Sequence, residues 1–200
     1  MPPRCDALSE PLSEDDRRAL LSRARQVIFE TICERRFPNL PSPAGRLADP
    51  GGAFVTLACD GKLRGCIGRT DATLPLAENV VQCAITAASQ DPRFKPLCAE
   101  ELSRLEIEIS VLSEPRPLRG EEIQPGIHGI IVSRGARRAL LLPQVAIERH
   151  WSSIQFLQAV CRKAELEPDA WRDPETKLLG FTAEVFSDVD VLAGEEGRGT

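Results

Sequence analysis

A thiol, a guanidinium group and two glycines stand within six residues of the chain, in the run Leu63-Arg64-Gly65-Cys66-Ile67-Gly68. A cation beside a cysteine stabilises the thiolate, which is the form that acts as a nucleophile or a metal ligand. Glycines on either side remove Cβ atoms, so a ligand can approach the backbone amides closely. The run therefore predicts a site in which Cys66 is the reactive thiol and Arg64 is the cation that activates it.

Other residues extend this candidate site. Arg69 follows the run directly, and Arg93 reaches the same surface if the loop around it folds back, so the surface favours an anion. His128 is a candidate to orient or deprotonate Cys66 if their strands are neighbours, because a thiol beside an imidazole is the usual nucleophilic arrangement. We assign catalytic roles to Cys66, Arg64 and His128 and ligand contacts to Gly65, Ile67, Gly68, Arg69 and Arg93.

A structural interpretation accounts for the same residues. A cysteine beside glycine in a strand usually serves packing, and the glycines can serve only a β-bulge. Arg64 can pair with a carboxylate such as Glu106 or Glu108, and His128 follows a Pro-Gly turn, where it can bond to the backbone. The residues alone leave both interpretations open.

A β-hairpin is expected to position the run. Residues 54–59 and 62–68 are extended in pattern, and Asp60-Gly61 between them suits a type I′ turn. If that turn alone sets the register, Leu57 faces Arg64 and Val55 faces Cys66. The side of the hairpin that faces the core then carries Phe54, Ala58, Leu63 and Ile67.

The surrounding pattern mixes helices with hairpins and single strands. Apolar spacing predicts helices over 14–35, 75–89 and from 152 or 153 to 164. Strands are predicted over 105–112 and 178–186, with a second hairpin over 128–133 and 136–142. Because strands and helices do not alternate strictly, we predict an α+β fold in which an antiparallel or mixed sheet is flanked by helices.

Composition and charge exclude several classes of protein. The net charge of −5 argues against a protein that grips nucleic-acid phosphates, and no run approaches the roughly 20 apolar residues of a membrane span. Seven cysteines without a Cys-x-x-Cys pair, with only two histidines, predict no metal site. We expect one cytoplasmic domain over 1–187, with a flexible tail over 188–200.

The run Leu63-Arg64-Gly65-Cys66-Ile67-Gly68 resembles the signature of the AMMECR family, whose members are also called AmmeMemoRadiSam system protein A. The likeness continues in the same order to about Phe186, through Asp91-Pro92-Arg93-Phe94, residues 105–112, Pro125-Gly126-Ile127-His128-Gly129, Leu141-Leu142-Pro143-Gln144-Val145, and Cys161-Arg162-Lys163-Ala164. The resemblance implies an α+β fold with an antiparallel sheet, flanking helices and a smaller subdomain. It also implies that the signature lines a pocket.

The resemblance implies partners rather than a reaction: a Memo-like protein, itself similar to non-haem iron dioxygenases, and a radical SAM enzyme. Two hypotheses follow. In the first, the chain is an enzyme or enzyme component that binds a small anionic ligand and acts through Cys66. In the second, it is a non-catalytic adaptor that docks onto partner proteins through the same surface. The sequence specifies no cofactor and does not decide whether the chain is an enzyme.

Overall fold

The computed structural model describes residues 11–34, 42–70 and 72–189, and the chain divides into two compact units. The described part of the larger unit comprises residues 11–34, 42–70, 72–112 and 184–189, and the smaller unit comprises residues 113–183. Each unit has its own four-stranded sheet and its own hydrophobic core. The predicted α+β fold with antiparallel pairing, helices and a smaller subdomain is confirmed.

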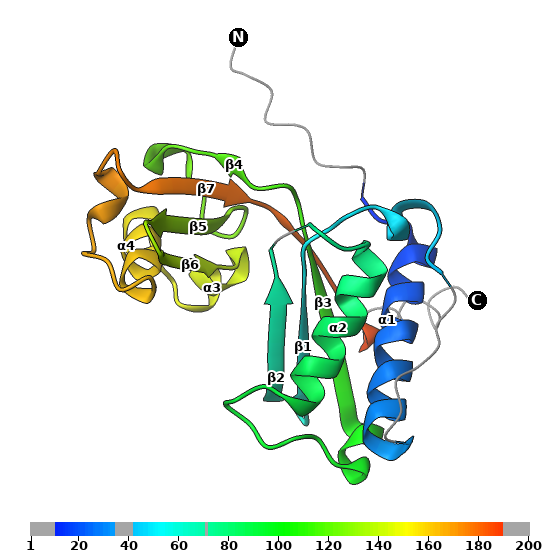
Figure 1. Ribbon diagram of the computed structural model, residues 1–200. Coiled ribbons are helices and arrows are strands. Elements are labelled where there is room, and N and C mark those ends of the chain that lie inside the picture. The colour runs from blue at the N-terminus through cyan, green and yellow to red at the C-terminus, as the bar shows by residue number, and fades with distance from the viewer. Residues whose placement is uncertain (1–10, 35–41, 71, 190–200) are drawn as a thin grey trace, which may run out of the picture. The chain divides into compact units, whose positions relative to one another are not determined.

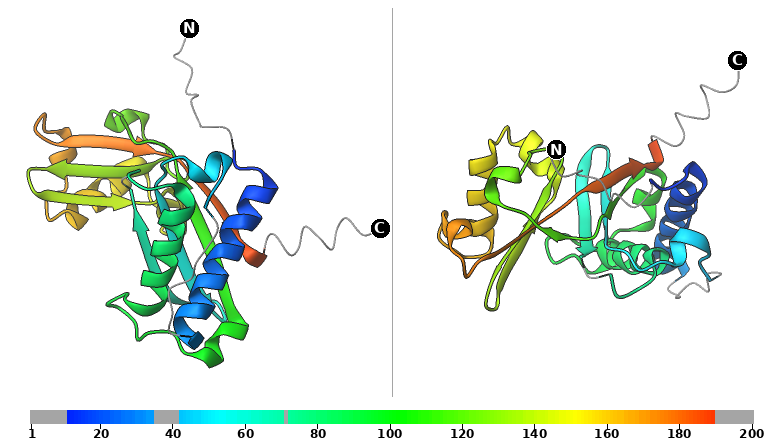
Figure 2. Two further views of the ribbon diagram at one scale, coloured as in Figure 1. Left: turned by 45° about the vertical axis from the view of Figure 1, so that its right-hand side comes forward. Right: turned by 90° about the horizontal axis from the view of Figure 1, so that it is seen from above.

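The sheet of the larger unit has the strand order β2-β1-β3-β8. Its strands are β1 (Ala53–Cys59), β2 (Lys62–Arg69), β3 (Leu105–Leu112) and β8 (Ala183–Ser187). Helices α1 (Glu14–Phe29) and α2 (Leu76–Ser89) lie side by side across one face of this sheet (Figures 1 and 2). Strand β2, which carries the signature run, is therefore an edge strand, and α2 packs behind it.

Local sequence explains where these helices begin. Ser13 caps α1 in a capping box with Asp16, as a serine before an acidic first turn predicts. Pro75 precedes α2, where its missing N–H costs nothing. The helix predicted over 14–35 is α-helical only to Phe29 and continues as a π-helical turn, Glu30–Glu34, while Arg35 lies outside the described residues.

The first hairpin turns at Asp60-Gly61, as predicted, and both residues have the positive φ of a type I′ turn (51° and 70°). The register beyond the turn differs from the prediction. Cys59 pairs with Lys62 and Ala58 with Leu63, but Leu57 then pairs with Gly65, so a β-bulge places Arg64 outside the ladder. The bulge shifts the rest of β2 by one residue.

The predicted core face of the hairpin is also reversed, and on β1 this does not depend on the bulge, since Ala58 still pairs with Leu63 as predicted. Val55 and Leu57 are fully buried against the helices, whereas Leu63 is 44% exposed. Cys66 pairs with Thr56, so both side chains lie on the sheet face opposite that core. The prediction that Phe54, Ala58, Leu63 and Ile67 form the core face was wrong, although Ile67 is partly buried against the core.

Helix α2 explains the place of the bulge. A Cβ atom at Gly65 would lie 2.3 Å from the carbonyl oxygen of Ala87, well inside van der Waals contact. Only glycine therefore lets β2 approach the last turns of α2 this closely. The close approach is a constraint from a distant part of the chain, and it overrides the register that the turn alone would set.

The smaller unit has the strand order β4-β7-β5-β6. Its elements are β4 (Arg116–Pro117), β5 (Gly129–Arg134), β6 (Arg137–Leu141), α3 (Pro143–Glu148), α4 (Ser153–Lys163) and β7 (Lys177–Phe181). The second predicted hairpin corresponds to β5 and β6, and Ser152 caps α4. The strand predicted over 178–186 is two strands, β7 and β8, which belong to different sheets.

Short 3-10 helices complete the described structure. They are Gly45–Ala48, Ala99–Arg104, Gly120–Glu122 and Ala170–Arg172. Of the tail predicted over 188–200, residues 190–200 lie outside the described residues. Asp188 pairs with Arg25 of α1 and accepts a hydrogen bond from the N–H of Ile107 at 3.2 Å.

We expect Gly65→Ala to lower the free energy of unfolding by about 3 kcal/mol. The new methyl group would overlap the backbone oxygen of Ala87, which is fixed in helix α2. Urea unfolding followed by circular dichroism measures this loss. Gly61→Ala is the matched control in the same hairpin, since it meets open space and should cost only about 1 kcal/mol of left-handed backbone strain. Equal losses in the two variants would contradict the role given to Ala87.

Candidate functional site

Cys66 lies in the middle of the edge strand β2, half-buried and not in a disulfide. Its cross-strand partner Thr56 donates a hydrogen bond from its hydroxyl group to the Cys66 Sγ atom at 3.3 Å. The backbone N–H and C=O of Cys66 bond to side chains beyond β2. The thiol therefore lies on a sheet face while its backbone faces the open edge of the sheet.

A tight turn at Asp91-Pro92-Arg93-Phe94 occupies that edge. The Phe94 N–H donates to the carbonyl of Asp91, and proline at the second position suits such a turn. The Asp91 carboxylate accepts four hydrogen bonds: from the Cys66 N–H at 2.9 Å and from the N–H, Nε and Nη2 of Arg93. Its side chain is only 1% exposed, and a carboxylate buried to that degree needs such complete pairing.

Arg93 completes the link between the turn and the strand. Its Nη2 donates to the Asp91 carboxylate at 2.7 Å and to the Cys66 carbonyl at 2.9 Å. The pKa of Arg93 is raised, chiefly by its hydrogen bond to the Asp91 carboxylate. Arg93 is therefore the cation that accompanies Cys66, and about half of its side chain stays exposed.

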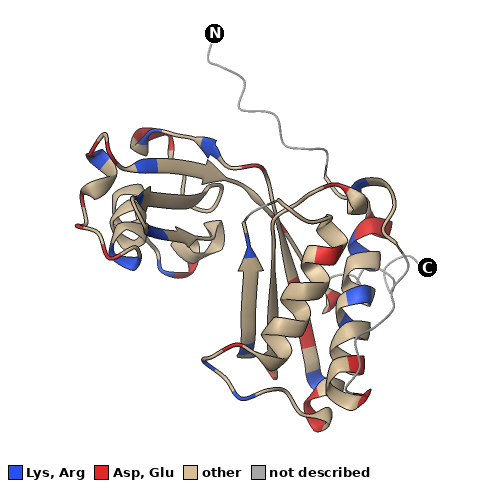
Figure 3. Cartoon of the chain, viewed as in Figure 1, with Lys and Arg blue, Asp and Glu red and all other residues tan. Residues whose placement is uncertain are grey.

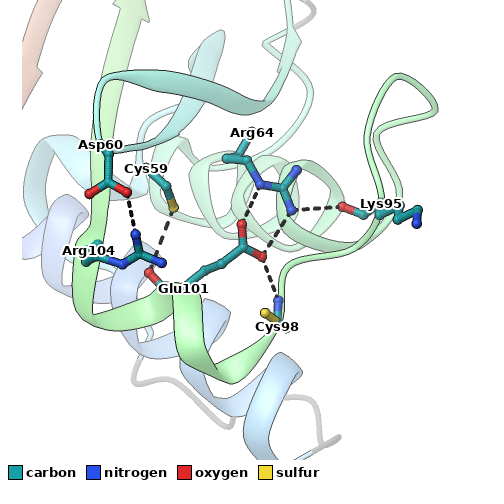
Figure 4. Close-up of polar contacts among 7 residues, drawn as sticks. All are labelled: Cys59, Asp60, Arg64, Lys95, Cys98, Glu101 and Arg104. Carbon is teal, nitrogen blue, oxygen red and sulfur yellow. Dashed lines mark hydrogen bonds and ion pairs between the residues drawn. The ribbon is translucent and has the colours of Figure 1, made fainter.

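Arg64, which we predicted to be the activating cation, binds Glu101 and the backbone carbonyl of Lys95 (Figure 4). Its Nε and Nη2 atoms donate to the two oxygens of Glu101 at 2.5 and 3.1 Å, and Nη2 also reaches the Lys95 carbonyl at 3.3 Å. The prediction that Arg64 pairs with a carboxylate such as Glu106 or Glu108 was wrong in its partner, which is Glu101. The bulge turns Arg64 towards the segment between α2 and β3, where Glu101 lies. A bidentate pair of this kind fixes both groups in one geometry.

Glu101 is the centre of this second cluster. Besides binding Arg64, its carboxylate accepts the Cys98 N–H at 3.0 Å, and its backbone carbonyl lies 3.8 Å from the Cys59 Sγ atom (Figure 4). The hydrogen bond from Arg64 is the largest cause that lowers the pKa of Glu101, to about 2. Together, Asp91 and Glu101 fasten both ends of the segment 91–101 to β2.

The other predicted ligand residues make specific contacts within the larger unit. Gly65 is buried against α2, and Ile67 is partly buried against the core. A Cβ at Gly68 would overlap the ring of Phe54, so that ring lies directly over the glycine. Arg69 is exposed and donates to the side-chain oxygen of Gln82 at 3.2 Å. Their assignment to ligand binding stays a prediction.

His128 belongs to the smaller unit, and its predicted role towards Cys66 stays a prediction. The side chain is buried, and its Nδ1 atom accepts a hydrogen bond from the N–H of Gln124 at 3.1 Å. Burial lowers the pKa of His128, and the positive charge of Arg116 lowers it further. Within its own unit the histidine is held neutral and holds the Gln124–His128 turn in place.

A hollow of about 660 Å³ lies elsewhere on the larger unit, between α1, the Asp60 turn, the 3-10 helix before β3 and Asp188. None of the six signature residues lines it. Among the described residues, no group of three His, Cys, Asp or Glu side chains could hold a metal ion. In the same part of the chain, no helix combines the length and the apolar character of a membrane span.

Charges of both signs are interspersed over the described elements rather than gathered on one face (Figure 3). Two arginines of this site follow this pattern, because Arg64 and Arg93 each pair with a carboxylate. Arg93 alone of these two keeps more than half of its side chain exposed (54% against 20%). Arg93 is therefore the more accessible of the two to solvent.

Sequence reasoning missed three residues that shape this site: Thr56, Asp91 and Glu101. The block Asp91-Pro92-Arg93-Phe94 carried a signal for one of them, since aspartate before proline favours a turn in which the carboxylate bonds to backbone N–H groups. Thr56 could be paired with Cys66 only after the bulge was known. Glu101 stands in a run with Glu100, and nothing in the spacing distinguishes the two.

Comparisons with known proteins agree with this architecture. Residues 21–186 match the sequence model of the family described as AMMECR1. A protein of Methanothermobacter thermautotrophicus is 42% identical over 88% of this chain and 96% of its own length, and protein MK0488 of Methanopyrus kandleri is 41% identical over 90% and 92%. The crystal structure of the uncharacterised protein PH0010 from Pyrococcus horikoshii has a TM-score of 0.79 and 38% identity, covering 84% of this chain and 89% of that one.

We expect Glu101→Gln to lower the free energy of unfolding at pH 7 by about 2 kcal/mol, because Arg64 loses its charged partner. The carboxylate has a lowered pKa in the folded state, so its contribution is complete above its ordinary value of 4.5 and is lost as the pH falls towards about 2. Urea unfolding between pH 2 and 6 should therefore show a shallower acid loss in the variant. Glu106→Gln, on an exposed residue of β3, is the control and should retain the wild-type slope.

We expect the smaller unit to lose stability as the pH falls below about 6.5, the ordinary pKa of histidine, because the unfolded chain takes up a proton that buried His128 resists. His128→Asn should remove this part of the pH dependence between pH 7 and 5, measured by hydrogen exchange of the β5 amides. His150→Asn is the control, since asparagine suits the left-handed φ of 52° at that position. An unchanged slope in His128→Asn would show that another group titrates.

Proposed function

The chain belongs to the AMMECR1 family, and on this basis we propose that it binds a small anionic ligand beside Cys66 and acts on it through the Cys66 thiol. In this proposal Arg93 receives the anion and the thiol supplies the chemistry. Arg64 serves a different purpose, which is to hold the segment 91–101 against β2. The proposal keeps the thiol that the sequence singled out and assigns its cation to Arg93.

The observation that carries the proposal is the fixed position of Arg93. A guanidinium group that donates to both Asp91 and the Cys66 carbonyl has lost most of its rotational freedom before any ligand arrives. Binding to such a group costs less conformational entropy than binding to a free arginine. Its charge also stabilises a thiolate beside it. One preorganised cation can thus serve both the ligand and the nucleophile.

The family resemblance adds a cellular setting to the proposal. We propose that the chain works in the cytoplasm as one component of a system that includes a Memo-like protein and a radical SAM enzyme. A thiol site on this chain would then hold or hand on a small molecule that passes between the partners. Co-purification of the three proteins after joint expression tests this part independently of the thiol.

The alternative is an adaptor that uses the signature for docking, without chemistry at Cys66. The contacts of Gly65, Gly68 and Arg64 favour this adaptor, because packing and ion pairing alone account for these three signature residues. The two proposals differ in one respect that can be measured. The thiol proposal requires Cys66 to react in the folded protein, whereas the adaptor tolerates an inert thiol.

We expect Cys66 to be alkylated by iodoacetamide at pH 7 faster than Cys33, an exposed cysteine of the same protein, with both rates read by mass spectrometry of the native chain. Arg93→Gln should slow the alkylation of Cys66 roughly tenfold, because the variant loses the positive charge that is held on the Cys66 carbonyl and that favours the reactive thiolate. Arg64→Gln should leave the rate within about twofold, since Arg64 donates to Glu101 and to the Lys95 carbonyl and not to Cys66. If Cys66 reacts only after unfolding, the thiol is packing and the adaptor becomes the working model.

A further inference from the structure

The backbone of Cys66 restricts the reactions that its thiol can perform. Cysteine and serine acyl-transfer enzymes stabilise the oxyanion with preorganised N–H donors, and the amide of the nucleophile itself often supplies one. Here that amide donates at 2.9 Å to Asp91, whose side chain is 1% exposed. Freeing it would leave a buried carboxylate short of a partner, which is costly. The site is therefore poorly suited to attack on a carbonyl carbon.

The groups that contact the thiol restrict the chemistry further. Thr56 donates its hydroxyl hydrogen to Sγ, and Arg93 is a permanent cation bound to the carbonyl of the same residue, so both favour negative charge on sulfur. Neither is a base or an acid near neutral pH. The local arrangement suits a reaction that needs a thiolate but neither an oxyanion hole nor a proton shuttle.

Thiol–disulfide exchange meets these requirements, because the attacking group is a thiolate and the leaving group is another thiolate. We propose that Cys66 reacts with anionic low-molecular-weight disulfides, whose carboxylates are received by Arg93, to form a mixed disulfide. This inference rests on the proposed function and names its class of substrate.

The step is balanced without another reactant. The Cys66 thiolate forms a bond to one sulfur of the disulfide, the S–S bond of the substrate breaks, and the second sulfur leaves with the electron pair and is protonated by water. Cys66 is oxidised to the mixed disulfide while the departing sulfur is reduced to a thiol. A free thiol in solution reverses the step in the same manner.

The chain offers a matched control for the charge effect. Arg104 is exposed to the same extent as Arg93, at 54%, and like Arg93 it pairs with an aspartate, Asp60. Its partners are at the hairpin turn rather than at Cys66. Arg104→Gln therefore removes one exposed, paired arginine from the same unit without touching the thiol. Cys33, which is exposed, supplies an internal reference for the reactivity of each reagent.

The experiment compares two disulfides of opposite charge on the reduced, full-length protein: oxidised glutathione, which is anionic, and cystamine, which is cationic. Mass spectrometry at low ionic strength measures the rate of mixed-disulfide formation at Cys66 and at Cys33. For each reagent, the rate at Cys66 is divided by the rate at Cys33. We expect this ratio to be about tenfold higher for oxidised glutathione. Arg93→Gln should bring the two ratios together, whereas Arg93→Lys and Arg104→Gln should keep them apart, and added salt should shrink the difference.

The outcomes separate this inference from the proposed function. If Cys66 is alkylated readily by iodoacetamide but shows equal ratios for the two disulfides, the thiol site stands and the anionic disulfide is overturned as its substrate. If Cys66 resists iodoacetamide and both disulfides in the folded protein, the proposed function fails as well. The wild-type comparison decides the matter even if Arg93→Gln does not fold.

Discussion

The carboxylate of Asp91 on the amide of Cys66 is the contact on which the rest of the site depends. It is a long-range hydrogen bond, formed where α2 has ended and the chain returns to the edge of the sheet. Because the carboxylate is buried, it needs all of its donors, and these donors include three nitrogens of Arg93. The position of the cation beside the thiol follows from the need to satisfy one buried acid.

A second ion pair keeps this arrangement in register. At the bulge the Arg64 side chain points towards Glu101, and its guanidinium group donates hydrogen bonds to the Glu101 carboxylate and to the Lys95 carbonyl. The segment between α2 and β3 is thus attached to β2 at two points, through Arg64 and through Cys66. Gly65 lies between these points and admits the backbone of α2. Neighbouring residues of the signature thus contact different parts of the fold: Arg64 binds Glu101, Gly65 packs on α2, and the Cys66 backbone binds Asp91 and Arg93.

Sequence reasoning could predict the parts of this site that depend on local chemistry. The Asp60-Gly61 turn, the capping serine of α1 and the alternation in β3 are properties of short segments, and the structure has them as expected. The bulge could not be predicted, because it depends on the distance between Gly65 and Ala87, which only the packed helix supplies. One extra residue in β2 then shifted the pairing beyond it, so the partner of Cys66 became Thr56 rather than Val55. Arg64, the extra residue of the bulge, binds Glu101, and it is Arg93 that donates to the Cys66 carbonyl.

The turn at Asp91 has a consequence for the behaviour of the protein at high concentration. An edge strand exposes a row of unpaired N–H and C=O groups, to which a strand from another molecule can add. At Cys66 both of these groups are already bonded to side chains of the turn, and Gly65 is buried against α2. A strand from another molecule would have to displace a buried carboxylate to pair there. The same residues that set the position of the thiol thus protect the β2 edge of the sheet from pairing with another molecule.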